Sequence, residues 1–315
     1  MVPIPTTLKG SNLLRVADWA CDDLEMVLEY ASRLKERHRE RVDDTVLERR
    51  TLGLIFDKPS TRTRVSFEVA MTHLGGTALN LTRDSMHLGH GEPIRDTAQV
   101  LSRFLDGVVI RTHAQTTVSD FAGAAEVPVI NGLTAEHHPC QALADVMTIR
   151  ERFENDSNVR VAFFGDGNNN VARSLIEACT ILGISISVAA PVGYEPDETT
   201  WKAAEAAAEH SGATIAIHRD PREAAADANV LYTDVWTSMG LEADAERRHA
   251  DLSLFGLNKS LLALGADDAI IMHCLPAKVG HEITDALLYG DSSAVWDQAE
   301  NRLHAQKALL ALTIR

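Results

Sequence analysis

The chain has 315 residues, of which 45% are hydrophobic and 24% are charged, and its formal net charge is −15. These values are typical of a folded globular protein that is long enough for two domains, each with a core of its own. The acidic balance argues against a nucleic-acid partner, which needs many lysines and arginines together, and no stretch approaches the roughly 18 apolar residues of a membrane span.

The N-terminal segment 1–16 lacks the basic region, apolar core and cleavage site of a secretory signal, so we expect a cytoplasmic protein. The four cysteines, at 21, 140, 179 and 274, are widely spaced, which favours reduced thiols over a disulfide framework. Apolar residues recur at helical spacing over 22–37, where an amphipathic helix is expected.

The first half then alternates between short apolar runs and longer segments. The runs cover 51–56, 77–81, 107–112 and 127–131, and the segments between them are long enough for helices. This pattern predicts parallel strands joined by crossover helices. A longer helix over 138–153 follows, and the domain junction is expected near its end.

The second half repeats this alternation. Strands are expected over 159–166, 185–191, 214–218, 230–236 and 269–274, and helices over 170–183 and 199–212 are each closed by a glycine. A last helix over 299–314 is of the kind that packs back on a neighbouring domain. We therefore predict an α/β protein with two doubly wound parallel-sheet domains, a cleft between them, and a C-terminal helix packed on the first domain.

Basic residues gather in the segment 56–68, where a strand, a turn and a helix follow one another. They are Lys58, Arg62 and Arg64. The free amides and the dipole at a helix start favour an anion, and the hydroxyls of Ser60, Thr61 and Thr63 with a guanidinium suit phosphate. Ser60 also suits the N-cap. From spacing alone, a capped surface helix with solvated arginines is an equally good interpretation.

Other polar residues are expected where strands end or helices begin. They are Arg111, His138, Gln141, Asp234, His273 and Cys274. Ligands of open α/β sheets bind outside the carboxyl ends of the strands. Each residue alone is more often structural, as Arg302 alone would be a charge on a helix face, but their joint placement favours a site.

Two other kinds of site have partial signals in the sequence. Gly165 and Gly167 resemble the start of a dinucleotide fold, but Asn170 replaces the third glycine and no acid ends the next strand, so a nicotinamide cofactor is not expected. His273 and Cys274 are adjacent, and neighbours on a strand point to opposite faces. We therefore expect no metal and reject a structural zinc.

Five motifs in this order resemble the transcarbamoylase family, and in particular its ornithine branch. They are STRTR at 60–64, HPCQ at 138–141, DVWTSMG at 234–240, HCLPA at 273–277 and ENRLHAQKA at 300–308. The broader family shares the first two motifs. The S-M-G run at 238–240 and the H-C-L-P run at 273–276 narrow the resemblance to the ornithine branch.

The resemblance implies a carbamoyl-phosphate-binding domain over 1–145 and 299–315, an ornithine-binding domain over 146–298, and an active site in the cleft. It implies transfer of the carbamoyl group of carbamoyl phosphate to the δ-amine of L-ornithine, which gives L-citrulline and phosphate without a cofactor. It also implies a homotrimer or a multimer of trimers.

The resemblance also assigns residues. Phosphate would be held by Ser60, Thr61, Arg62, Thr63 and Arg111, and by His87 from a neighbouring subunit, where the family often has glutamine. The carbamoyl group would be contacted by His138, Gln141, Arg302 and the backbone of Cys274 and Leu275. The catalytic set would be Arg62, Thr63, His138, Cys274 and Arg302. Ornithine would be held by Asn170, Asp234, Ser238 and Met239; Asn170 is preferred to Asn169 because it keeps the family's spacing.

Rival interpretations stay open at this point. One is a carbamoyltransferase for another amine, such as putrescine or an acylated ornithine. Another is a non-catalytic paralogue that binds carbamoyl phosphate. The sequence leaves open whether the reaction runs towards citrulline or backwards.

Overall fold

The computed structural model describes residues 7–42, 44–57, 60–82, 91–153, 156–237 and 242–314. The chain divides into two compact units, a first unit of Met1–Ala144 with Arg302–Arg315 and a second unit of Asp145–Asn301. Within the described ranges, no helix combines the length and apolar character that a membrane span requires.

The first unit contains a parallel sheet with the strand order β2-β1-β3-β4. Its strands are β1 (Thr51–Phe56), β2 (Thr77–Thr82), β3 (Gly107–Arg111) and β4 (Val129–Leu133). Its helices are η1 (Val16–Asp18), α1 (Cys21–Arg39), α2 (Thr61–His73), α3 (Ile94–Leu101) and α4 (Gln115–Ala124). The described strands and the crossovers between them confirm the expected parallel sheet.

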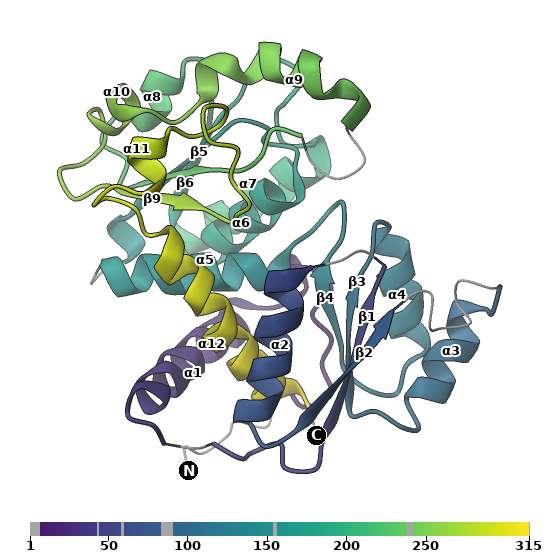
Figure 1. Ribbon diagram of the computed structural model, residues 1–315. Coiled ribbons are helices and arrows are strands. Elements are labelled where there is room, and N and C mark those ends of the chain that lie inside the picture. The colour runs from purple at the N-terminus through teal and green to yellow at the C-terminus, as the bar shows by residue number, and fades with distance from the viewer. Residues whose placement is uncertain are drawn as a thin grey trace. The chain divides into compact units, whose positions relative to one another are not determined.

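One face of this sheet packs on α3 and α4, which lie together beside the strands (Figure 1). The core there joins Ile55, Val108 and Ile110 from the strands to Val118 and Phe121 from α4. The central strands read as nearly continuous apolar runs because they are buried on both faces. Strand β2 is at the edge of the sheet and has a largely exposed pattern.

The second unit contains a parallel sheet with the strand order β7-β6-β5-β8-β9. Its strands are β5 (Arg160–Phe164), β6 (Ser185–Ala189), β7 (Ile215–His218), β8 (Val230–Thr233) and β9 (Ile270–His273). Its helical elements are η4 (Asp156–Asn158), α6 (Asn170–Ile181), α7 (Glu198–Ser211), α8 (Pro221–Ala225), η5 (Glu242–Asp244), α9 (Ala245–Leu252), η6 (Ser253–Phe255), α10 (Lys259–Leu262) and α11 (Asp285–Leu288).

Two helices run through the boundary between the units. Helix α5 (Pro139–Arg152) begins in the first unit and ends in the second, and α12 (Val295–Thr313) does the reverse. The C-terminal end of the chain is bound to the first unit: Gly10 donates its amide to the carbonyl of Thr313 at 2.8 Å. The last helix thus belongs in part to the unit that contains the N-terminus.

Most strands differ from the predicted ranges by one to three residues at an end, and two of these differences have a local reason. Strand β4 starts at Val129, two residues later than expected, after Pro128, which has no amide to give to a ladder. Strand β8 ends at Thr233 and not at 236. There the carboxylate of Asp234 accepts a bond at 2.7 Å from the amide of Val235, which turns the backbone out of the strand.

The core of the first unit allows a matched test of stability. Phe121 is 1% exposed and Phe104 is 71% exposed. We expect Phe121→Ala to lower the free energy of unfolding of this unit by about 3–5 kcal/mol, because it removes buried apolar area and leaves a cavity. Phe104→Ala should change it by less than about 0.5 kcal/mol. Denaturant unfolding followed by circular dichroism measures both, and equal losses would contradict the packing described.

Candidate active site

The start of α2 lies beyond the carboxyl end of β1, in the first unit. Ser60 takes the N-cap position as expected, but its side chain makes no capping hydrogen bond. Thr61 and Arg62 in the first turn are exposed, whereas Thr63 is buried. The amides of a first helical turn have no partner within the helix, so this end of α2 can receive an anion.

Arg302 from α12 is the centre of a buried hydrogen-bond cluster beside the start of α2. It is 3% exposed. Its guanidinium donates to Thr63 Oγ1 at 2.9 Å and to Gln141 Oε1 at 2.7 Å, and it lies 3.2 Å from His138 Nε2. Arg111, at the end of β3, donates to the same Thr63 hydroxyl at 3.3 Å. Four expected site residues are thus held around Arg302.

The charge state of His138 follows from this cluster. Burial is the main cause that holds the pKa of His138 well below its usual value, and the guanidinium groups of Arg302, Arg111 and Arg62 lower it further. Because Arg302 can only donate, Nε2 of the neutral imidazole accepts and the ring proton lies on Nδ1. His138 is therefore a neutral group that can donate from Nδ1.

Arg64 differs from Arg62 in its partner. It lies one turn into α2, is exposed, and pairs at 4.0 Å with Glu68 on the same helix. It thus behaves as the solvated helix charge of the alternative interpretation, whereas Arg62 is close enough to His138 to affect its pKa. Lys58 and His87 lie outside the described residues.

In the second unit, the loop after β5 leads into α6. Asn169 is the N-cap of α6, and its side-chain oxygen accepts from the amide of Ala172 at 2.7 Å. Its amide nitrogen lies 3.5 Å from Asp234 Oδ2. Asn170 is the first residue of the helix and is half-buried. The capping role of Asn169 leaves Asn170 as the better candidate to meet a ligand.

Asp234 and Cys274 come together beyond the ends of β8 and β9. The thiol of Cys274 donates to Asp234 Oδ1 at 3.0 Å, and the amide of Val235 donates to the same oxygen. Burial raises the pKa of Asp234, and the hydrogen bonds from Cys274 and Val235 oppose that rise. Ser238 and Met239, which were expected to complete this site, lie outside the described residues.

The geometric argument against a metal at His273 and Cys274 was wrong. One ligand atom each of Asp234, His273 and Cys274 lies within 4.8 Å of the others. The alternation of a strand does not separate the adjacent pair because β9 ends at His273. These atoms already have protein partners: His273 Nδ1 accepts from the Leu275 amide at 2.8 Å, and Nε2 lies 3.3 Å from Glu282.

Arg248 of α9 was missed by the sequence analysis. It is 7% exposed, pairs with the carboxylate of Asp166 in the loop after β5, and donates to the backbone carbonyl of Trp236 after β8. Its guanidinium also lies 5.0 Å from the ring centre of Tyr194. Arg248 therefore fixes the loop that precedes Asn169 and the loop that follows Asp234. A lone arginine in a polar helix gave no signal of this burial.

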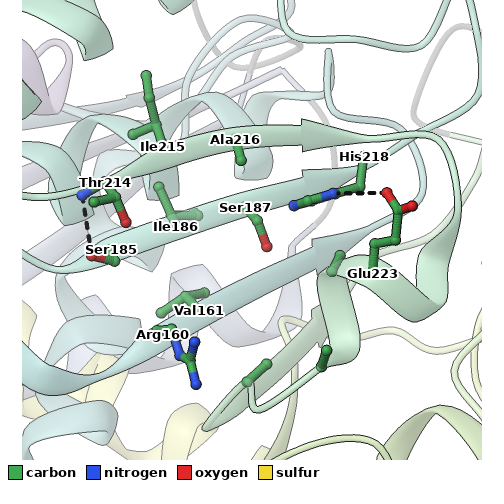
Figure 2. Close-up of a pocket in the computed structure, with 13 residues that line it drawn as sticks. Arg160, Val161, Ser185, Ile186, Ser187, Thr214, Ile215, Ala216, His218 and Glu223 are labelled. Atoms are coloured by element: carbon green, nitrogen blue, oxygen red, sulfur yellow. Dashed lines mark hydrogen bonds and ion pairs between the residues drawn. The ribbon is translucent and has the colours of Figure 1, made fainter.

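A cavity of about 180 Å³ opens elsewhere, on the face of the second unit's sheet over β5, β6 and β7 (Figure 2). Arg160 lies at the start of these strands, and His218 pairs with Glu223 at 3.2 Å near their ends. The lining between them includes Ser185 and Ser187 as well as Ile186 and Ile215. The expected site residues do not line this cavity, so the strand ends remain the candidate site.

Comparisons with known proteins point to one family. The carbamoyl-P binding domain model of aspartate/ornithine carbamoyltransferase matches residues 11–151, and the Asp/Orn binding domain model matches 157–313. The ornithine carbamoyltransferase of Methanopyrus kandleri is 50% identical over 307 residues, which cover 97% of both chains. The anabolic ornithine carbamoyltransferase of Pyrococcus furiosus is 50% identical over 308 residues, or 98% of each chain.

Solved structures agree as well. The ornithine carbamoyltransferase structure from Pyrococcus furiosus superposes with a TM-score of 0.94 at 50% identity and covers 98% of both chains. That from Gloeobacter violaceus gives a TM-score of 0.87 at 45% identity and covers 98% of this chain and 100% of the other. The chain belongs to the aspartate/ornithine carbamoyltransferase family.

Proposed function

We propose that the chain transfers the carbamoyl group of carbamoyl phosphate to the δ-amine of L-ornithine and releases L-citrulline and phosphate. The observation that carries this proposal is the buried cluster in which Arg302 bonds to Thr63, Gln141 and His138 beside the start of α2. This cluster supports the proposal because a guanidinium and a neutral imidazole beside a helix start suit a phosphate and its attached carbonyl. The names of the similar proteins favour ornithine over another amine or a non-catalytic role.

The phosphate end binds at the start of α2. Its contacts are Ser60, Thr61, Arg62, Thr63 and Arg111, with His87 from a neighbouring subunit as a further contact. The first-turn amides and the helix dipole add partial positive charge at this place. These donors neutralise the charge of the departing phosphate, which makes it a better leaving group.

The carbamoyl oxygen is polarised by hydrogen-bond donors of the first unit. These are Arg62, Thr63 and Arg302, with Nδ1 of His138 and the amide of Gln141. The uncharged δ-amine attacks the carbonyl carbon, a tetrahedral intermediate forms, the C–O bond to phosphate breaks, and the proton lost by the amine nitrogen ends on the released phosphate. Donors fixed before the reaction stabilise the charge on the oxygen without reorganising, and two held substrates gain from proximity.

The second unit binds ornithine. The carboxylate of Asp234 attracts its α-ammonium group, and Asn170, Ser238 and the Met239 backbone hold the α-amino and α-carboxylate ends. Cys274 and the backbone of Leu275 complete the carbamoyl site, and Cys274 is kept in place by its bond to Asp234 at 3.0 Å. This chemistry needs no cofactor.

We propose that the carbamoyl-phosphate-binding domain spans 1–145 with 299–315 and that the ornithine-binding domain spans 146–298, close to the bounds of the two compact units. We propose a cytoplasmic homotrimer, or a multimer of trimers, in which the first unit makes the subunit contacts. Exposed apolar side chains on that unit support this assembly: Val65, Leu79 and Val100. Free thiols suit a reducing compartment.

The proposal is tested by offering the purified protein carbamoyl phosphate with ornithine, putrescine, N-acetylornithine or aspartate, and measuring ureido product. We expect product with ornithine, because the carboxylate of Asp234 matches a free α-ammonium group. Turnover with another amine alone would overturn the ornithine assignment and leave the phosphate site standing. Binding of carbamoyl phosphate without any product would support the non-catalytic interpretation.

Arg62 and Arg64 form a matched pair for mutation. We expect Arg62→Ala to lower kcat/KM about a hundredfold to a thousandfold, the usual effect of removing one donor to a developing charge. Arg64→Ala should leave kcat/KM near that of the parent, since Arg64 pairs with Glu68. Steady-state kinetics and thermal unfolding of both variants check this. Parental activity in a folded Arg62→Ala variant would remove Arg62 from the site.

Activity should rise with pH. A primary alkyl amine has a pKa of about 10.4, so the fraction of nucleophilic ornithine grows roughly tenfold for each pH unit between 7 and 9. The pKa of His138 lies well below 6.5. His138 therefore stays neutral over this range and adds no step to the pH profile of kcat/KM. The measurement is kcat/KM for ornithine against pH. A flat profile, or a step near pH 6.5 that disappears in His138→Asn, would contradict this.

A further inference from the structure

A buried polar network holds the turn after β9. This turn carries Cys274 and Leu275, and Leu275 has a φ of +60°, an unfavourable value for a residue with a side chain. His273 Nδ1 accepts from the Leu275 amide at 2.8 Å. The conformation of the turn therefore depends on where the end of β9 is held.

Strand β9 is an edge strand, so the outer side of its backbone lacks a neighbouring strand. At Ile271 the segment 292–294 supplies backbone partners at 2.8 and 2.9 Å. At His273 a side chain supplies the partner instead: the amide of His273 donates to Gln298 Oε1 at 2.9 Å. Gln298 thus completes the edge of the sheet at the residue just before Cys274.

The amide of Gln298 is oriented by two further groups. Its nitrogen donates to Asp145 Oδ1 at 2.7 Å and to the hydroxyl of Tyr232 at 3.0 Å, and Tyr232 donates to Asp145 Oδ2 at 3.1 Å. All three residues are 0% exposed. With both acceptors on one side, the oxygen of Gln298 must face His273.

The other side of His273 is fixed as well. Its Nε2 lies 3.3 Å from the fully buried carboxylate of Glu282, which also accepts from the amide of Lys278. Because Nδ1 accepts from Leu275, the ring proton lies on Nε2 and points to Glu282. His273 is therefore held through its backbone by Gln298 and through its ring by Glu282.

We propose that Gln298 is a positioning residue for the reaction, one that acts through His273 to place Cys274 and Leu275 against the carbamoyl group and the attacking amine. This inference rests on the proposed function. Gln298 itself touches no substrate. Its effect therefore falls on kcat, whereas phosphate affinity, which belongs to the first unit, stays unchanged.

The decisive comparison is between Gln298→Leu and the double variant Asp145→Asn with Gln298→Glu. Gln298→Leu removes the acceptor for the His273 amide. The double variant exchanges the carboxylate and the amide: the new carboxylate at 298 can accept from His273, and the new amide at 145 can donate to it. Net charge is the same as in the parent. The matched control is Asp297→Asn. Asp297 lies next to Gln298 on the same helix and is an exposed partner of Arg152.

We expect Gln298→Leu to lower kcat between about tenfold and a hundredfold, since a small misplacement of a reacting group has effects of this size. The inhibition constant of inorganic phosphate should stay at the parental value. Hydrogen exchange measured on the peptide that contains His273 should become faster. The double variant should recover both kcat and slow exchange, and Asp297→Asn should match the parent.

Three results would overturn the inference. They are a parental kcat in Gln298→Leu, parental exchange at His273 in that variant, and a folded double variant that recovers neither property. If Gln298→Leu does not fold, kcat and hydrogen exchange of the double variant alone test the inference. If the parent makes no citrulline, the proposed function fails by itself, and the exchange of the His273 amide still reports whether Gln298 positions the turn.

Discussion

The buried guanidinium of Arg302 is the constraint on which the first unit's site depends. A buried cation is costly unless every donor is given an acceptor. Thr63 at the start of α2 and Gln141 at the start of α5 supply two such acceptors, and Thr63 is 239 residues away in the chain. The requirement to satisfy Arg302 therefore brings the C-terminal helix, α2 and α5 to one place.

The same constraint sets the charge of the site. The acceptors described for Arg302 are a hydroxyl, an amide and an imidazole, which carry no negative charge. The positive charge of Arg302 is therefore not cancelled by them, and it keeps the neighbouring His138 neutral, in addition to the effect of burial. A chain with a net charge of −15 thus keeps a local excess of positive charge beside a helix start. An anionic substrate is the natural partner of that excess.

Much of the fold and part of the site could be predicted from the sequence. The central strands were predictable because a strand buried on both faces is a continuous apolar run. His138 was singled out by its place at a helix start, whereas Arg302 was found only through a motif, because a lone arginine on a helix has no mark of burial. Gln298 and Arg248 carried no motif and were missed. Their importance comes from tertiary neighbours, Asp145 and Asp166, that lie far away in the sequence.

The two units support their candidate sites with groups of opposite charge. In each, the groups that meet a ligand lie beyond the carboxyl ends of parallel strands, where backbone leaves the sheet and needs support from behind. The first unit supports its site with a cation and the second with buried carboxylates, such as Glu282 behind His273. Asp234 gains donors from Cys274 and Val235 that favour its ionised form against burial. These opposite charges support the proposal that the first unit attracts an anion and the second a cationic amine.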